Sequence, residues 1–162
     1  MNPLQPVDHS ALRTNQAVII LLLLLSFILD LPLLAGLVGL MMLASALAGK
    51  AAFGWLYTAL LKPRGWLKPD VLPDNRQPHT FAQGFGGMVL LIGAIFFLTG
   101  TPLAGWGLVW LVIALASLNL FVGFCVGCAV YYWLNHLGVP GFTQSPPPGT
   151  PAGWRPRRGE QQ

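Results

Sequence analysis

Residues 119–134, NLFVGFCVGCAVYYWL, end a long apolar segment that begins at Leu103, and they contain both cysteines of the chain. Residues 77–154 carry no Lys, Arg, Asp or Glu, and residues 14–29 and 31–49 are uncharged as well. Stretches of this length can hold about four helical spans, at about 20 residues a span. The chain is 54% hydrophobic and 9% charged, whereas soluble domains have about 25% charged residues. The sequence therefore predicts an integral membrane protein.

The order of apolar and polar segments predicts an all-α fold of four transmembrane helices, arranged as two antiparallel hairpins. A polar N-terminal lead over residues 1–12 precedes a four-helix transmembrane domain over residues 13–138. The expected spans are residues 15–29, 32–49 with an extension to 61, 81–98 and 103–137. The charged, proline-containing residues 62–78 form the loop between the hairpins, and the proline-rich residues 143–162 form a disordered tail.

The two halves of the chain are similar to each other. Each half has a polar, basic-flanked start, a first span, a turn with a proline, and a second helix longer than the bilayer is thick. The sequences PLLAGLVGL from Pro32 and PLAGWGLVWL from Pro102 are alike at an offset of 70 residues. We interpret this pattern as a parallel duplication of one helical hairpin.

Basic residues lie on one side of this predicted topology. They occur before the first span, between the second and third spans, and after the fourth: Arg13; Lys50, Lys62, Arg64, Lys68 and Arg76; Arg155, Arg157 and Arg158. The two short turns within the hairpins carry none. The positive-inside rule therefore predicts that both termini and the loop over residues 62–78 are cytoplasmic.

The spacing of Cys125 and Cys128, a CxxC pair, is typical of redox-active dithiols and of metal ligands. In one straight helix over residues 103–137, Cys125 lies roughly 33 Å along the axis, at the cytoplasmic edge of the hydrocarbon layer. A single cysteine is often a small buried hydrophobe, so two inert packing residues are the alternative to a reactive pair.

A redox dithiol needs one sulfur as the thiolate. The later part of a continuous helix opposes this charge, because the helix dipole is negative there. Activation then has to come from cations at the same membrane edge, Arg13, Arg76 or His79, unless Gly123 breaks the helix and a new N-terminus begins at Phe124. The cytoplasm keeps thiols reduced, so the sequence favours a transient disulfide over a stable structural one.

Two further groups of residues surround the pair. Asn15, Gln16 and Gln83 lie just inside the apolar segments, and we expect them to form a polar vestibule facing the cysteines; ordinary solvated helix ends are the alternative. Gly123 and Gly127 share a small-residue face in a GxxxG pattern, which predicts close packing against another helix.

The sequence supports no metal site and no cofactor. A Cys2His2 zinc site would need His79 and His136, but no close-spaced histidine pair supports one. A quinone could dock among the aromatic residues near the cysteines, although such residues are more often lipid contacts. Nucleic acid is not an expected partner, because the nine basic residues are scattered and no stacking aromatics are set within a basic run. The expected partner surface is the lipid bilayer, and an oligomer is compatible with the glycine face.

Three stretches resemble a known family of bacterial membrane proteins, domain of unknown function 4395. They are RTNQ at residues 13–16, PHTFAQGFG at residues 78–86 and LNLFVGFCVGCAVYY at residues 118–132, and the likeness covers about residues 7–138. The Phe-Cys-x-Gly-Cys motif is its most specific part. The family's name assigns no activity.

The resemblance implies both a cellular location and a type of chemistry for this chain. Cys125 and Cys128 match the family motif, and Arg13, Phe81 and Gln83 match weaker positions. The family implies a multi-pass protein of the bacterial inner membrane. Its association with thioredoxin-like or sulfurtransferase-like proteins implies a thiol-redox or sulfur-handling role, with such a protein as partner.

Two functions follow as hypotheses from different classes. In the first, Cys125 and Cys128 cycle between dithiol and disulfide or carry a persulfide, with His79, Arg13 or Arg76 in support. In the second, the chain is a non-catalytic membrane subunit or small-solute permease whose cysteines only pack. The residues alone do not decide between an enzyme and a non-catalytic protein.

Overall fold

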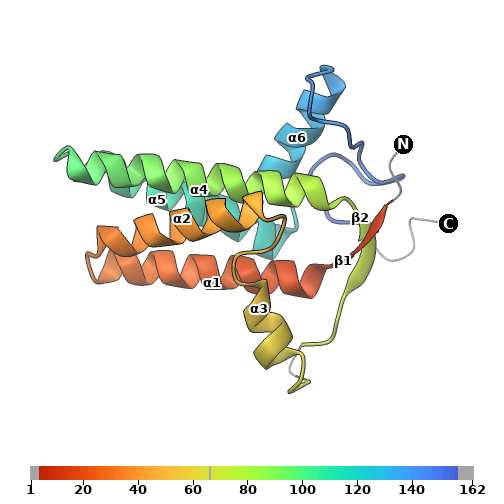
Figure 1. Cartoon of the computed structure of the whole chain (residues 1–162), viewed down its shortest axis with the longest axis horizontal. Coiled ribbons are helices and arrows are strands. Elements are labelled where there is room, and N and C mark those ends of the chain that lie inside the picture. The colour runs from red at the N-terminus through yellow and green to blue at the C-terminus, as the bar shows by residue number, and fades with distance from the viewer. Residues whose placement is uncertain (1–3, 66, 157–162) are drawn as a thin grey trace.

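The computed structural model describes residues 4–65 and 67–156, and it is mostly helical (Figure 1). The elements follow in the order β1 (Gln5–Asp8), α1 (His9–Ile28), α2 (Pro32–Leu47), α3 (Gly54–Leu56), η1 (Tyr57–Leu61), β2 (Val71–Asp74), α4 (Arg76–Leu98), α5 (Pro102–Ser117), η2 (Leu118–Val122) and α6 (Val126–His136). The η elements are single π-helical turns. The expectation of an all-α chain is wrong in one detail, because β1 and β2 pair as a two-stranded sheet.

Helices α1, α2, α4 and α5 run alongside one another as the main bundle (Figure 1). Helix α2 contacts both α1 and α4, and α5 contacts α4 and α1. Within the described residues, three helices are long and apolar enough to cross a membrane: α1, α4, and α5 continued through η2 to Val122. Helix α2 has 16 residues, about 24 Å at 1.5 Å per residue, and is shorter than the roughly 30 Å hydrocarbon core.

The turns that close the two helix pairs have the same local structure. Asp30 and Gly100 both adopt left-handed backbone, with φ of 50° and 77°. In each turn a proline follows at the first position of the next helix, where its missing N–H costs no hydrogen bond. Equivalent backbone hydrogen bonds join Leu31 to Ser26 and Thr101 to Phe96. The predicted repeat at an offset of 70 residues thus coincides with two matching turns.

The bundle core is apolar and closely packed. Four of its side chains are fully buried: Ile19, Leu23, Leu90 and Val109. Helices α2 and α4 approach each other closely, since a Cβ on Gly39 would lie 3.0 Å from the carbonyl oxygen of Gly87. Small residues therefore allow close helix contact in this chain. Of the predicted pair, Gly127 lies at such a contact, where α6 crosses α4, whereas Gly123 does not.

The predicted single helix over residues 103–137 is wrong. Gly123 has φ of 78° and ends η2, because glycine takes the left-handed conformation at little cost. The chain then turns, and α6 leaves the bundle at a large angle (Figure 1). Gly123 is thus the break between two helices rather than a packing residue inside one. The extension of α2 to residue 61 is broken in the same way, at Gly49 with φ of 65°.

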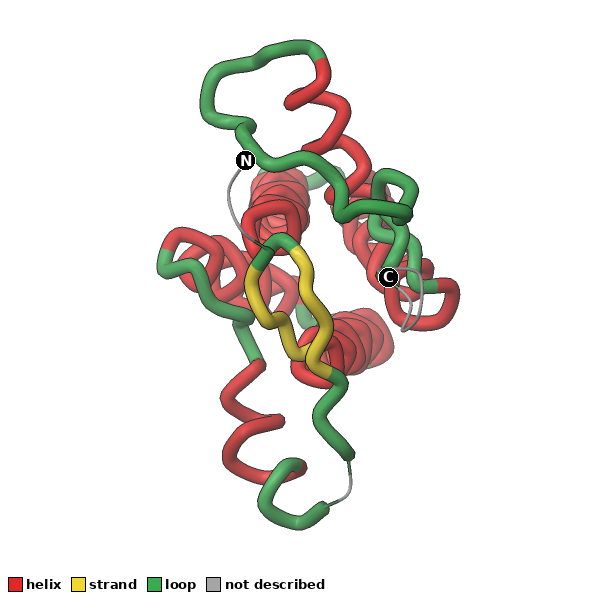
Figure 2. The backbone as a smooth tube through the Cα atoms, turned by 90° about the vertical axis from the view of Figure 1, so that its right-hand side faces the viewer, coloured by secondary structure: helices red, strands yellow, loops and turns green. Residues whose placement is uncertain are grey.

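The N-terminal lead and the loop at residues 62–78 are more structured than predicted. Helix α1 begins at His9, because the Asp8 side chain accepts a hydrogen bond of 3.0 Å from the Ser10 N–H and caps the helix. β1 pairs antiparallel with β2, and the ribbon lies across one end of the bundle (Figure 2). This pairing brings the start of the chain beside the start of α4.

Residues 143–156, here called the C-terminal strap, are not the predicted disordered tail. The carbonyl oxygen of Gly153 accepts a 2.7 Å hydrogen bond from the Cys125 N–H, and the Arg155 N–H donates to the Gly123 carbonyl at 3.0 Å. The strap therefore closes over the break before α6. Residues 157–162, which the tail prediction also includes, lie outside the described residues.

Gly127 lies where α6 crosses α4, and we expect Gly127→Ala to lower the free energy of unfolding by about 2 kcal/mol through overpacking. A Cβ at this position would lie 2.5 Å from the Ala82 Cβ and 2.8 Å from its Cα. Thermal unfolding in detergent, followed by circular dichroism, measures the change. Gly107→Ala is the matched control because nothing lies within 4 Å of its added Cβ; equal destabilisation by both changes would contradict the close contact.

Candidate functional site

The two cysteines lie at the N-terminus of α6, held there by the left-handed turn at Gly123. Cys125 is the N-cap residue, and its Sγ accepts a 3.2 Å hydrogen bond from the backbone N–H of Cys128. The two sulfurs form a disulfide between Cα atoms 5.2 Å apart. Cys125 is 7% exposed and Cys128 is 3% exposed. The pair therefore occupies the positive end of a helix, where a thiolate is stabilised.

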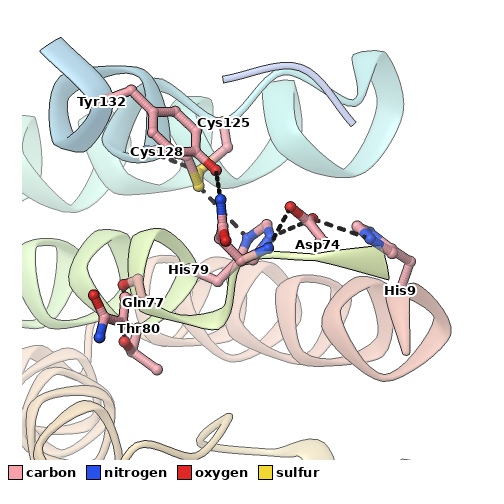
Figure 3. Close-up of a disulfide and its surroundings, with 9 residues drawn as sticks. His9, Asp74, Gln77, His79, Thr80, Cys125, Cys128 and Tyr132 are labelled. Atoms are coloured by element: carbon pink, nitrogen blue, oxygen red, sulfur yellow. Dashed lines mark hydrogen bonds and ion pairs between the residues drawn. A yellow bond between two sulfur atoms is a disulfide. The ribbon is translucent and has the colours of Figure 1, made fainter. Parts of the chain in front are cut away.

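His79 of α4 faces the disulfide, and Asp74 at the end of β2 holds it in place (Figure 3). The His79 Nδ1 lies 3.5 Å from the Cys128 Sγ, and its Nε2 lies 3.0 Å from the Asp74 Oδ2. An ionised carboxylate can only accept, so Nε2 carries the hydrogen and Nδ1 of the neutral ring presents a lone pair to the sulfur. The order Cys128, His79, Asp74 is that of a thiol, a base and a residue that orients the base.

Asp74 is the buried acid of the site and is 3% exposed. Its Oδ1 accepts a 2.7 Å hydrogen bond from the Asn75 N–H, and its Oδ2 is also 3.2 Å from the Nε2 of His9. Burial acts to raise the pKa of Asp74, but the interactions with His79, His9 and the Asn75 N–H outweigh it and hold the pKa well below its usual range. Asp74 is therefore the ionised centre of the site at neutral pH.

We expect Asp74→Asn to lower the free energy of unfolding by about 2 kcal/mol at neutral pH, because hydrogen bonds to a charged acceptor are lost. The pKa of Asp74 is depressed in the folded state, so its stabilisation is fully present above its ordinary pKa of 3.8 and is lost as the pH falls below that value. Thermal unfolding of both proteins across this range measures the difference. A gap between wild type and variant that stays as wide at pH 3 as at pH 6 would contradict this role.

Further polar contacts join the strap and α6 to this centre. The Asn75 Nδ2 donates to the Tyr132 hydroxyl at 3.2 Å and to the Ser145 carbonyl at 2.6 Å. Burial raises the pKa of Tyr132 to about 12, so the hydroxyl stays neutral and can accept this bond. The Arg155 Nε donates to the His9 Nδ1 at 3.3 Å. A continuous chain of side chains therefore runs from Cys128 through His79, Asp74 and His9 to the strap.

Two cavities meet at the disulfide. One, of about 40 Å³, is polar, and both cysteines line it together with His9, Arg13, His79 and Arg155. The other, of about 100 Å³, is lined mostly by apolar side chains of α1, α4, α5 and α6, and of the two cysteines only Cys125 borders it. Cys125 is thus approachable from the bundle side, whereas Cys128 faces His79.

The predicted vestibule residues line the polar cavity, but two of them are occupied structurally. Gln16, Asn15 and Gln83 all border it. The Asn15 side chain donates to the Gln83 Oε1 at 3.1 Å and accepts from the Phe53 N–H at 2.8 Å, and Gln83 donates to the Ser45 hydroxyl at 2.6 Å. These two amides therefore tie α1, α2 and α4 together, which leaves Gln16 as the freer polar side chain.

The basic residues predicted to activate the thiols lie at different distances from the cysteines. Arg13 is exposed and lines the polar cavity that reaches the cysteines. Arg76 is exposed and lines a neighbouring cavity beside His79 that neither cysteine borders. His136, named in the zinc alternative, is exposed in the last turn of α6, at the far end of that helix from the cysteines. His79 is thus the predicted residue that contacts a sulfur.

Sequence reasoning missed Asp74, His9 and Arg155. Asp74 had no clear signal, because it lies in the predicted loop over residues 62–78, seven residues before the predicted span at residue 81. His9 follows Asp8, a helix-start signal that places it at the first turn of α1. Arg155 had no signal, because it reaches the site through the strap.

The comparisons with known proteins give a family and nothing more. A family model described as a domain of unknown function (DUF4395) matches residues 7–136. No curated protein and no solved structure matches the chain. The matched residues contain the second half of β1, all of β2, both cysteines, His79 and Asp74, whereas the strap lies beyond them.

Proposed function

Since the chain belongs to this family, DUF4395, whose description names no activity, we propose from the site geometry that it is a membrane thiol–disulfide exchange protein that uses Cys125 and Cys128. The position of His79, between the Asp74 carboxylate and the Cys128 sulfur, supports the proposal most. A pair of inert packing cysteines has no need of an oriented base. The helix N-terminus at Cys125 adds the second requirement, a stabilised thiolate.

The two sulfurs have different roles in the proposed exchange: Cys125 is attacked and Cys128 leaves. A thiolate of a partner dithiol attacks the Cys125 Sγ, the bond between Cys125 and Cys128 breaks, and Cys128 leaves as a thiolate that takes a proton through His79. The second partner thiolate then attacks the mixed disulfide and releases Cys125 as a thiolate, stabilised by the Cys128 N–H. Two electrons pass from the partner dithiol to the cysteine pair; of the two protons that the partner loses, one ends on Cys128 and one goes to solvent while Cys125 stays a thiolate. The reverse sequence reduces a partner disulfide. A thioredoxin-like or sulfurtransferase-like protein has the chemistry of such a partner.

For the membrane arrangement, we propose four spans in two duplicated hairpins, with α2 as the short fourth span. The matching turns at residues 29–32 and 99–102 support the duplication. They lie at the bundle end opposite the disulfide, so the positive-inside rule puts the cysteines and both termini on the cytoplasmic side of a bacterial inner membrane. Labelling intact cells tests this placement: a membrane-permeant maleimide should label the reduced cysteines and an impermeant one should not.

The test of function is the reduction potential of the cysteine pair in the folded protein. We expect a potential of roughly −120 to −270 mV, the range of exchange-active disulfides. The purified protein is equilibrated in detergent with dithiol buffers, and free thiols are trapped with a maleimide that shifts the gel band. Cys125→Ser and Cys128→Ser variants identify the band of each state.

Two results would contradict the exchange function. A potential below about −300 mV would indicate a structural disulfide. A pair that fails to exchange with any dithiol while the protein stays folded would favour the alternative function, a non-catalytic subunit or permease in which the cysteines only pack.

A further inference from the structure

Beyond exchange, the geometry points to a metal site: we propose that the reduced form binds one Zn²⁺ through Cys125, Cys128 and His79. This inference rests on the proposed function in one respect, that the disulfide can be opened in the folded protein. The Sγ atoms of both cysteines and the Nδ1 of His79 all lie within 4.8 Å of one another. Cysteine thiolates and imidazole nitrogen are the ligands that zinc prefers.

The distance between two of the ligand atoms already fits a bound zinc. Zinc lies about 2.3 Å from sulfur and 2.0–2.1 Å from nitrogen in a tetrahedral site, which separates the two ligand atoms by about 3.6 Å. The His79 Nδ1 lies 3.5 Å from the Cys128 Sγ. Opening the disulfide frees the Cys125 sulfur to move away from Cys128 and take the next corner of the tetrahedron. The backbone does not have to move for the histidine and Cys128 to bind together.

The surroundings of His79 are those of a metal ligand. Asp74 holds the Nε2–H of His79, so the Nδ1 lone pair points to the sulfurs. A carboxylate behind a ligating histidine orients the ring and raises its basicity, and losing it typically costs 10–100-fold in metal affinity. The Asp74 carboxylate is itself fixed by the Asn75 N–H. The orienting group is therefore buried and in place before any ion enters.

Charge and space both favour an ion in the reduced state. Two thiolates in a site that is 3–7% exposed are costly unless a cation compensates them. The adjoining polar cavity has about 40 Å³, which exceeds the roughly 10–15 Å³ that a water needs. A three-residue site with room for a water is of the open type, which keeps one coordination position for an exogenous ligand.

Binding and oxidation exclude each other at this site. Loading converts two thiols and Zn²⁺ into a zinc dithiolate and releases two protons. Oxidation by a partner disulfide removes two electrons from the thiolates, forms the bond between Cys125 and Cys128, and releases Zn²⁺, while the partner disulfide takes up these two electrons and two protons from solvent and becomes a dithiol. Zinc therefore stabilises the reduced state of the exchange site.

Cobalt titration of the reduced protein tests the site. The protein is reduced in detergent, freed of reductant without oxygen, and its thiols are counted before Co²⁺ is added. We expect one Co²⁺ per chain, with a sulfur-to-cobalt charge-transfer band and the intense visible bands of tetrahedral cobalt, and displacement by one Zn²⁺. Cys125→Ser, Cys128→Ser and His79→Ala should each remove the tetrahedral spectrum. Asp74→Asn should weaken binding about 10–100-fold, and His136→Ala should leave it unchanged.

The possible results separate this inference from the exchange function. Free thiols that reoxidise reversibly but give no tetrahedral spectrum would overturn the metal site alone. Binding that persists in the reduced His79→Ala protein would overturn it too, because the ion would then be held elsewhere. A folded protein whose disulfide cannot be reduced would overturn both proposals. Metal binding without exchange on any dithiol would leave the metal site standing and remove the exchange function.

Discussion

Replacing His79 with glutamine is expected to slow dithiol–disulfide exchange at pH 7 by about 100-fold, the lower part of the range for a positioned acid or base. In the wild type, the His79 Nδ1 lies 3.5 Å from the Cys128 sulfur, and once it has taken up a proton it can pass that proton to the leaving sulfur. Glutamine keeps polarity but has no group that exchanges a proton in this range. Stopped-flow or quenched-gel measurement of exchange with a small dithiol gives the rate.

The pH profile and a second histidine separate proton transfer from a structural effect. Above about pH 8.5, where a thiol ionises unaided, the rates of His79→Gln and wild type should converge. His9→Gln is the matched control, since His9 lies 3.2 Å from the same Asp74 oxygen but is not the histidine at the Cys128 sulfur. A similar loss in both variants, constant with pH, would mean that the histidines only stabilise Asp74.

The apolar pattern predicts the bundle well, because long uncharged segments have few alternatives to helices. It does not predict where a helix breaks. Gly123 occurs in an apolar run, where glycine is also common inside transmembrane helices, so the sequence allows both a continuous helix and a new N-terminus at the cysteines. The structure selects the new N-terminus. This choice moves the thiolate from the unfavourable to the favourable end of a helix dipole.

The site residues likewise divide into those that the sequence identifies and those that it does not. Cys125, Cys128 and His79 are identifiable from residue type and from their predicted place at one membrane edge. His9 is not, because its contact with Asp74 depends on the pairing of β1 with β2, two four-residue strands that carry no periodic signal of their own. The strap is missed for another reason: its contacts with Gly123 and Cys125 use backbone groups. Composition describes side chains and cannot show such contacts.

Dislodging the strap should make the disulfide easier to reduce, and Gly153→Val is designed to do so. Gly153 has φ of 83°, and a Cβ there would lie 2.7 Å from the Ala129 Cβ and 2.9 Å from the Cys125 carbonyl oxygen. The two backbone hydrogen bonds that hold the strap contribute about 1 kcal/mol each, so losing both raises the open population about 30-fold. Reduction by a small thiol, trapped at intervals with maleimide, should accelerate by this factor.

Two further variants show whether the strap controls access. Pro148→Ala changes an exposed residue of the same strap and should leave the rate of reduction unchanged. Removal of residues 143–162 should reproduce the acceleration seen with Gly153→Val, because both free the Cys125 N–H from the Gly153 carbonyl. If both strap variants stay folded and are reduced no faster than wild type, the reductant reaches Cys125 from the apolar cavity. A partner would then approach from the bundle side, and the strap would serve stability alone.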